Sequence, residues 1–127
     1  MYAEKVMSIF KNPKNMGKMQ NPDGVGKVGN TLCGDVMKIY IKVKKDKKGR
    51  EVISDISCET FGCVAAIVTS SVLTEKAKGK TLQEAMKISP KDIIKVLGKI
   101  PNEKVHCSVL STRALQAAIE DYKKRPS

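Results

Sequence analysis

The chain has 127 residues and a mass of 13.9 kDa, which fits a single domain over residues 1–127. Apolar residues make up 41% and charged residues 29%, the balance of an ordinary globular protein. The amino-terminal stretch lacks the apolar segment of a signal peptide, and no later stretch approaches membrane-spanning length. We therefore expect a cytoplasmic protein with no membrane partner, whose four cysteines stay reduced.

The formal net charge of +11 raises the question of nucleic-acid binding. Lysines cluster along one predicted strand and the turn after it, at positions 42, 44, 45, 47 and 48. Single-stranded nucleic acids stack their bases on aromatic side chains, and here only Tyr40 lies near the cluster. We interpret the lysines as a solvated surface, with attraction to an acidic protein as the alternative, and expect no nucleic-acid partner.

The first half of the chain predicts one helix and then strands. Residues 2–11 place apolar side chains on one side of a short helix that ends before a proline. Residues 13–24 predict a loop, and residues 25–30 predict a weak strand interrupted by glycine. Residues 36–44 alternate apolar with polar side chains, the period of a strand with one face in water. Residues 51–58 return as the second strand of an antiparallel hairpin.

The second half predicts helices. Residues 63–78 are mostly small and apolar and stop at a glycine, as a buried helix does. A capping box predicts a short helix over residues 81–86, and a serine followed by proline and aspartate predicts another over residues 89–98. Residues 107–123 predict the last helix. Strands followed by helices indicate an α+β domain, a small sheet with helices packed against it.

Three cysteines lie where predicted elements begin. Cys33 precedes the strong strand, Cys63 opens the buried helix, and Cys107 opens the last helix. The positive end of a helix favours the thiolate, which is the form that binds iron or zinc and attacks sulfur. Asp35 and His106 lie close by in the sequence and could complete a metal site, or could simply cap a turn and a helix. The spacing alone also leaves a structural role for the three cysteines open, because Cys-x-x-Cys is absent.

Cys58 belongs to a different environment. It shares a predicted strand face with Val52 and Ile56 and has no glycine, aspartate or histidine beside it. A cysteine in such a position is commonly a small buried hydrophobe. We therefore expect Cys58 in the core rather than at a site.

The residues around the three cysteines resemble a known family. The stretches around Cys33 (Gly29 to Met37), Cys63 (Thr60 to Ser71) and Cys107 (Lys104 to Ser108) are similar, in order, to the three cysteine motifs of the IscU/NifU N-terminal family of iron–sulfur cluster assembly scaffolds. This resemblance implies a three-stranded antiparallel sheet with helices around it. It also implies a scaffold and carrier rather than an enzyme.

The resemblance further implies what the residues do. Cys33, Cys63 and Cys107 become ligands of a labile [2Fe-2S] cluster, Asp35 and His106 compete for the fourth position, and Cys107 accepts the persulfide. Sulfur comes from a cysteine desulfurase, and the cluster passes to apo-proteins. Family members also bind zinc at this site. The sequence leaves both a monomer and a homodimer open.

One departure from the family pattern concerns a chaperone. Members served by a dedicated Hsp70-type chaperone carry Leu-Pro-Pro-Val-Lys before the histidine–cysteine pair, whereas residues 100–104 read Ile-Pro-Asn-Glu-Lys here. This departure argues against such a chaperone as a partner. Two other classes fit the sequence less well. A structural zinc protein would use the same ligands, and an enzyme with a cysteine nucleophile and His106 as base would leave Cys33 and Cys63 without roles.

Overall fold

The computed structural model describes residues 4–30, 35–62, 64–98 and 106–125 of the chain. Three antiparallel strands form one sheet in the order β1–β2–β3, with bounds β1 Gly24–Asn30, β2 Asp35–Lys45 and β3 Glu51–Phe61. The described helices are α1 Glu4–Lys11, α2 Val64–Ala77, α3 Leu82–Met86, α4 Pro90–Leu97 and α5 His106–Lys124. The predicted α+β class, a three-stranded antiparallel sheet with packed helices, is confirmed.

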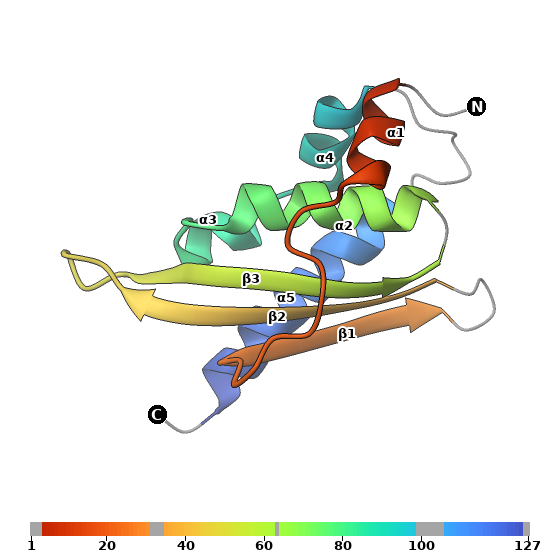
Figure 1. Ribbon diagram of the computed structural model, residues 1–127. Helices are drawn as coiled ribbons and strands as arrows, with labels where there is room; N and C mark the ends of the chain where they lie inside the picture. Colours follow the sequence, from red (N-terminus) through yellow and green to blue (C-terminus); the bar gives the residue numbers. More distant parts are fainter. Residues whose placement is uncertain (1–3, 31–34, 63, 99–105, 126–127) are drawn as a thin grey trace.

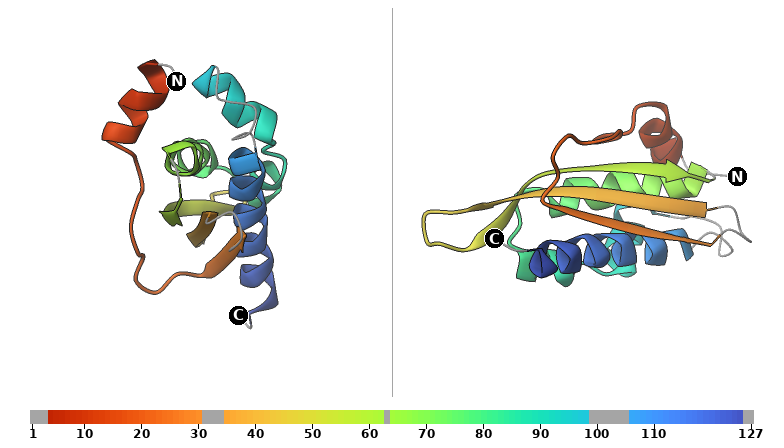
Figure 2. Two further views of the ribbon diagram at one scale, coloured as in Figure 1. Left: turned by 90° about the vertical axis from the view of Figure 1, so that its right-hand side faces the viewer. Right: turned by 90° about the horizontal axis from the view of Figure 1, so that it is seen from below.

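The helices and the amino-terminal segment cover opposite faces of the sheet (Figures 1 and 2). Helix α5 packs along β1 and β2, and α2 packs on β3 and against α5. Helices α1 and α4 lie on α2. The segment that joins α1 to β1 crosses the other face of the sheet (Figure 1). No helix in the described part of the chain is both long and apolar enough to cross a membrane.

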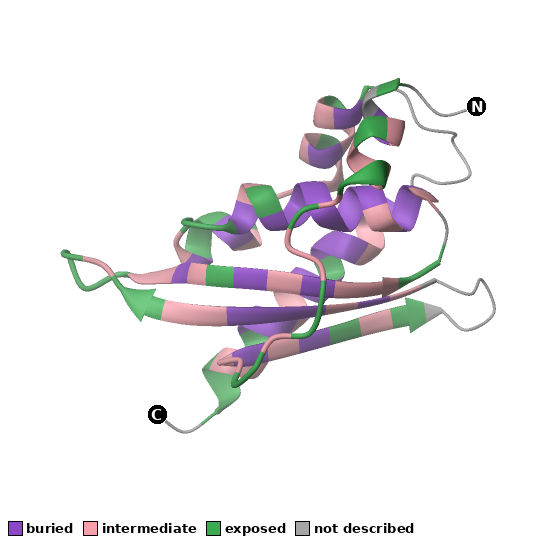
Figure 3. Ribbon diagram, in the orientation of Figure 1, coloured by how far each residue is buried: buried purple, intermediate pink, exposed green. Residues whose placement is uncertain are grey.

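The core lies between the sheet and the two long helices (Figure 3). Its strand residues come from the apolar positions of β2 and β3, and its helix residues come mainly from α2 and α5. The largest fully buried side chains are Met37, Ile39, Ile41, Ile53, Ile56, Leu73, Ile93, Leu97, Leu115 and Ile119. Aliphatic side chains of this size each contribute about 1.5–3 kcal/mol when fully buried, so the core does not depend on aromatic residues.

Strand β3 differs from its prediction in two ways. It continues to Phe61, three residues beyond the predicted end, because Thr60 and Phe61 still pair with β2. A register shift between Lys42 and Val43 leaves Ser54 without an opposite residue. Such a bulge moves the following side chains to the other face, so Ile53 rather than Val52 shares the buried face with Ile56 and Cys58.

Tyr40 is buried although the alternation of β2 places it on the face predicted to be wet. Its ring lies under the Lys38 ammonium, 5.1 Å from the centroid, and its hydroxyl donates a hydrogen bond to Glu59. Desolvation and the bond to Glu59 raise the pKa of Tyr40. Tyr40 is only 3% exposed, so the face opposite the helices is not uniformly in water.

Strand β1 contains glycines because α5 lies directly on it. A Cβ at Gly26 would come within 2.2 Å of the Ala114 carbonyl oxygen, and one at Gly24 within 2.3 Å of the Ala118 carbonyl oxygen. No other residue leaves room for such an approach of helix backbone to strand. The glycines that weaken the sequence signal for this strand therefore allow its packing.

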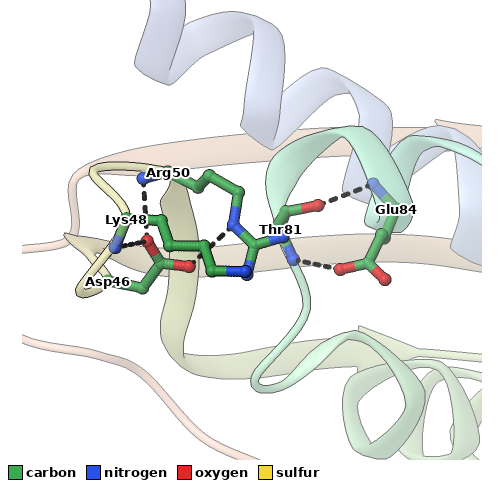
Figure 4. Close-up of polar contacts among 5 residues, drawn as sticks. All are labelled: Asp46, Lys48, Arg50, Thr81 and Glu84. Carbon is green, nitrogen blue, oxygen red and sulfur yellow. Dashed lines mark hydrogen bonds and ion pairs between the residues drawn. The ribbon is translucent and has the colours of Figure 1, made fainter.

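The predicted helix signals are confirmed at α3, α4 and the end of α2. The Thr81 hydroxyl accepts from the Glu84 amide at 3.1 Å, and the Glu84 carboxylate accepts from the Thr81 amide at 3.0 Å (Figure 4). At α4 the Asp92 carboxylate accepts from the Ser89 amide at 2.9 Å and from the Ser89 hydroxyl at 3.2 Å. Gly79 follows α2 with φ +85°, a conformation that favours glycine.

The β2–β3 turn carries its own ion pair. Asp46 accepts from the Lys48 and Arg50 amides and from the Arg50 guanidinium, at 2.8–2.9 Å (Figure 4). The Arg50 amide and guanidinium lower the pKa of Asp46. These bonds close the predicted turn over residues 45–50.

Candidate functional site

The described residues that flank Cys33 and Cys63 lie at one end of the sheet. Asn30 and Asp35 pair as the last residue of β1 and the first residue of β2, so the described residues on both sides of Cys33 lie there. Phe61, the last residue of β3, pairs with Val36 directly beside them. Helix α2 then begins at Val64. Cys33 and Cys63 themselves lie outside the described residues.

Helix α5 brings Cys107 to the same end. It runs antiparallel to β1, because Gly24 lies against Ala118 and Gly26 lies against Ala114. Its first residues are therefore on the side where β1 ends, and Figure 2 (left) looks onto this end of the molecule. His106 is the first residue of α5 and Cys107 is the second.

Cys107 is fully buried, with 0% of its surface exposed. The Thr69 hydroxyl on α2 approaches the Cys107 carbonyl oxygen at 3.5 Å and the Ala66 carbonyl oxygen at 3.2 Å. Ser108, the next residue of α5, is also fully buried. The first turn of α5 is thus packed against the first turns of α2, the helix that follows Cys63.

A second hydroxyl contact links β3 to α2 at this end. The Thr60 and Ser70 hydroxyls form a hydrogen bond at 3.0 Å, and Ser70 also donates to the Ala66 and Ile67 carbonyls. Thr60 is three residues before Cys63 in the sequence. The buried hydroxyls of α2 therefore contact both neighbours of the candidate site, β3 through Ser70 and α5 through Thr69.

Cys58 is a core residue, as predicted. It is 0% exposed, and its thiol lies 3.2 Å from the Met16 sulfur. Burial raises the pKa of Cys58, and hydrogen bonds with Ser70 and Thr60 oppose that shift. A protonated, inaccessible thiol is a poor metal ligand and a poor nucleophile.

The structure describes only part of the predicted site. It places the Asp35 and His106 backbones at the same end as Cys107, and nothing is described of these two side chains. Within the described ranges, no group of three histidine, cysteine, aspartate or glutamate residues could hold a metal ion. Cys33 and Cys63, on which the predicted group depends, are outside those ranges, so the ligand set stays a prediction.

Sequence reasoning missed the exposure of Phe61. Among the described residues it is the large apolar side chain that is exposed, at 71%. It borders a hollow lined by Lys27, Val36, Lys38 and Glu59. The alternation of the strand could have identified it. Once β3 is extended to its true end, Phe61 lies on the opposite face of the strand from Thr60 and Cys58.

Comparison with known proteins places this geometry in a family. The whole chain, residues 1–127, matches the family described as the NifU-like N terminal domain. The chain belongs to this family.

Relatives of the chain include proteins named as iron–sulfur cluster assembly scaffolds and one named for nitrogen fixation. The chain is 53% identical over 122 residues to iron-sulfur cluster assembly scaffold protein IscU 1 of Archaeoglobus fulgidus, covering 96% of this chain and 76% of the relative. It is 45% identical over 127 residues to the IscU scaffold protein of Escherichia coli K12, covering 98% and 95%. It is 45% identical over 122 residues to nitrogen fixation protein NifU of Azotobacter chroococcum, covering 96% of this chain and 38% of that longer protein.

Solved structures share the fold. A putative iron-sulfur cluster assembly scaffold protein for the SUF system from Fervidobacterium islandicum matches with a TM-score of 0.72 and 27% identity, covering 93% of this chain and 96% of that one. The amino-terminal part of a NifU-like protein from Brucella abortus matches with a TM-score of 0.70 at 19% identity, covering 98% and 95%.

Proposed function

We propose that this chain is a scaffold on which a [2Fe-2S] cluster is assembled and from which the cluster passes to apo-proteins. The observation that supports the proposal is that the described residues flanking Cys33 and Cys63 lie at the same end of the fold as Cys107. Relatives of the chain, matched over nearly all of its length, are named as iron–sulfur cluster assembly scaffold proteins. A scaffold holds its cargo and releases it, so the chain is not an enzyme with a small-molecule substrate.

Cys33, Cys63 and Cys107 are the proposed cluster ligands, with Asp35 or His106 in the fourth position. Three soft thiolates suit iron bridged by sulfide. An oxygen or imidazole ligand leaves one position weaker than a fourth thiolate would, and exchangeable binding is what a donor needs. The same donors, three thiolates with an imidazole or carboxylate, complete a tetrahedral shell for zinc in the apo-protein.

Cys107 is the proposed sulfur acceptor. Its thiolate attacks the outer sulfur of a persulfide on the cysteine desulfurase, the sulfur–sulfur bond of that persulfide breaks, and the desulfurase leaves as a thiolate. No external oxidant is needed, because the transferred sulfur keeps its oxidation state. The burial of Cys107 means that the thiol must become accessible before this step can occur.

The test is anaerobic reconstitution of the purified chain with iron, cysteine and a cysteine desulfurase, followed by visible absorption. We expect the absorption of a [2Fe-2S] cluster on the chain. After apo-ferredoxin is added and the two proteins are separated, that absorption should have left the chain and appeared on the ferredoxin. A chain that keeps zinc and refuses a cluster under these conditions would be a structural zinc protein instead. An apo-ferredoxin that stays empty would show that the chain stores a cluster without donating it.

A further inference from the structure

The first two turns of α5 contain a cluster of buried polar groups whose arrangement the proposed function does not explain. Cys107, Ser108 and Ser111 are each 0% exposed, and Thr112 is 5% exposed. Ser111 donates to the Ser108 carbonyl oxygen at 2.9 Å, whereas the Ser108 hydroxyl has no hydrogen-bond partner within the described part of the chain. Burying such groups is costly unless they are bonded, so the contacts that hold these turns in place matter.

Helix α2 contributes one of those contacts through Thr69. This side chain is fully buried, and its hydroxyl lies between two carbonyl oxygens, 3.2 Å from that of Ala66 in its own helix and 3.5 Å from that of Cys107 in α5. Fully buried alanines at positions 65 and 66 are small enough for the neighbouring elements to come close. Thr69 lies six residues after Cys63, so one side chain couples the helix that follows one candidate ligand to the backbone of another.

We infer that Thr69 is a positioning residue: its hydroxyl holds the first turn of α5 against α2 and thereby keeps the Cys107 thiol out of solvent. Opening of this contact precedes any reaction of Cys107 with a partner. The role of Cys107 in sulfur transfer rests on the proposed function. The burial of its thiol and the effect of Thr69 on that burial do not.

The experiment measures how fast iodoacetamide alkylates Cys107 and Cys58 in the apo-protein at one fixed pH, by mass spectrometry of the two peptides. Alkylation of a buried thiol requires local opening, so its rate follows the population of the open state. The variants are Thr69→Val, which removes the hydroxyl and keeps the shape, and Thr69→Ser, which keeps the hydroxyl. One net hydrogen bond corresponds to about a 2- to 10-fold change in that population.

We expect Thr69→Val to raise the alkylation rate of Cys107 by about 2- to 10-fold while the rate of Cys58 stays unchanged. Thr69→Ser should behave as the unmodified protein does. Thr74→Val is the matched control: Thr74 is also fully buried in α2 and donates to the carbonyl three residues earlier, at 2.7 Å, but its other recorded contact is Asn15 rather than α5. This control should leave Cys107 protected.

Three outcomes would overturn the inference: an unchanged Cys107 rate in folded Thr69→Val, an equal rise at Cys58, or an equal rise in Thr74→Val. If Thr69→Val does not fold, the pair Thr69→Ala and Thr69→Ser decides, because both lack the methyl group and differ in the hydroxyl. Equal Cys107 rates in that pair would then reject the role. The assay uses neither iron nor desulfurase, so its result is independent of whether the chain assembles a cluster.

Discussion

The two ends of the sheet hold their polar groups in different ways. At the hairpin end, carboxylates accept the hydrogen bonds: Asp46 binds Arg50, and Glu51 accepts from the Tyr122 hydroxyl. At the cysteine end, where β1 ends and α5 begins, neutral hydroxyls contact backbone carbonyls, as between Thr69 and the Cys107 carbonyl oxygen. The bonds of Asp46 close the turn at the first end. The second end holds Cys107 and the described residues that flank Cys33 and Cys63, and it is where the proposed function places the exchange of cargo.

The most direct test of the difference between the two ends is whether cluster binding depends on the three cysteines proposed as ligands. Serine substitutions at Cys33, Cys63 and Cys107, made one at a time, should each abolish most of the cluster absorption. Cys58→Ser should keep it, because the Cys58 thiol is buried beside Met16 in the core. A folded Cys58→Ser variant without a cluster would show that the ligand assignment is wrong.

The packing of α5, which carries Cys107, depends on Gly26. Gly26→Ala would place a Cβ within 2.2 Å of the Ala114 carbonyl oxygen and within 2.4 Å of the Ala118 amide nitrogen. Backbone cannot move aside as a flexible side chain can, so we expect a loss of about 3 kcal/mol in the free energy of unfolding. Urea denaturation measures it. Gly49→Ala is the control in the hairpin turn, where nothing lies within 4 Å and only the positive φ opposes alanine, at about 1 kcal/mol.

A substitution of Asp35 tests whether this residue keeps the proposed cluster exchangeable. Asp35→Ala removes the proposed oxygen donor and leaves His106 as the proposed fourth ligand, and neutral imidazole is a good partner for iron beside thiolates. The cluster should therefore form, survive a chelator several-fold longer and pass more slowly to an apo-ferredoxin. Paired decay and transfer rates under identical anaerobic conditions measure this. Faster decay together with faster transfer would make Asp35 a retaining ligand.

The hairpin end should respond to alkali. The hydrogen bond to Glu51, as the largest cause, and desolvation, as the next, raise the pKa of Tyr122 to about 12. The folded pKa lies above the unfolded one, so the contribution of this tyrosine to stability is complete below pH 10 and is lost as the pH rises toward 12. Thermal unfolding across this range measures the loss. Tyr122→Phe should show a smaller decline, and an equal decline would assign the effect to other groups.

The smallest effect is expected from the lysines of the hairpin. Reversing the charges of Lys44, Lys47 and Lys48, which are exposed, should leave desulfurase-driven cluster assembly nearly unchanged. Binding of the desulfurase to the chain and the rate of cluster assembly, each measured at two salt concentrations, test this. A large loss that added salt reproduces in the unmodified protein would instead make the hairpin a docking surface for an acidic protein.

Local patterns in the sequence were enough to predict most of the elements. The capping box at Thr81 and the glycine at the end of α2 mark their helices, because each acts through neighbours in the chain. Distant contacts decide the rest. The glycines of β1 weaken the sequence signal for this strand, and only the packing of α5 on them explains their presence. Tyr40 reads as solvent-exposed until its cross-strand bond to Glu59 is known.

In the candidate site, too, some features follow from local sequence patterns and others depend on distant contacts. The positions of Cys33, Cys63 and Cys107 at the starts of elements could be predicted from the chain alone. That the three starts meet at one end depends on the register of the strands and on the direction of α5. The burial of Cys107 and its contact with Thr69 could not be predicted, since no local pattern links residues 38 positions apart.

The packing of α5 on β1 also has a consequence for the time course of synthesis. The Val25 amide donates to Asp121, a partner 96 residues later. At a translation rate of roughly 5–20 residues per second, the β1 strand waits about 5–20 seconds on the ribosome before its covering helix exists. During that interval the apolar face of the sheet has no partner from α5. The nascent chain therefore spends most of its synthesis open to misassociation, and it closes only when the helix that carries Cys107 has been made.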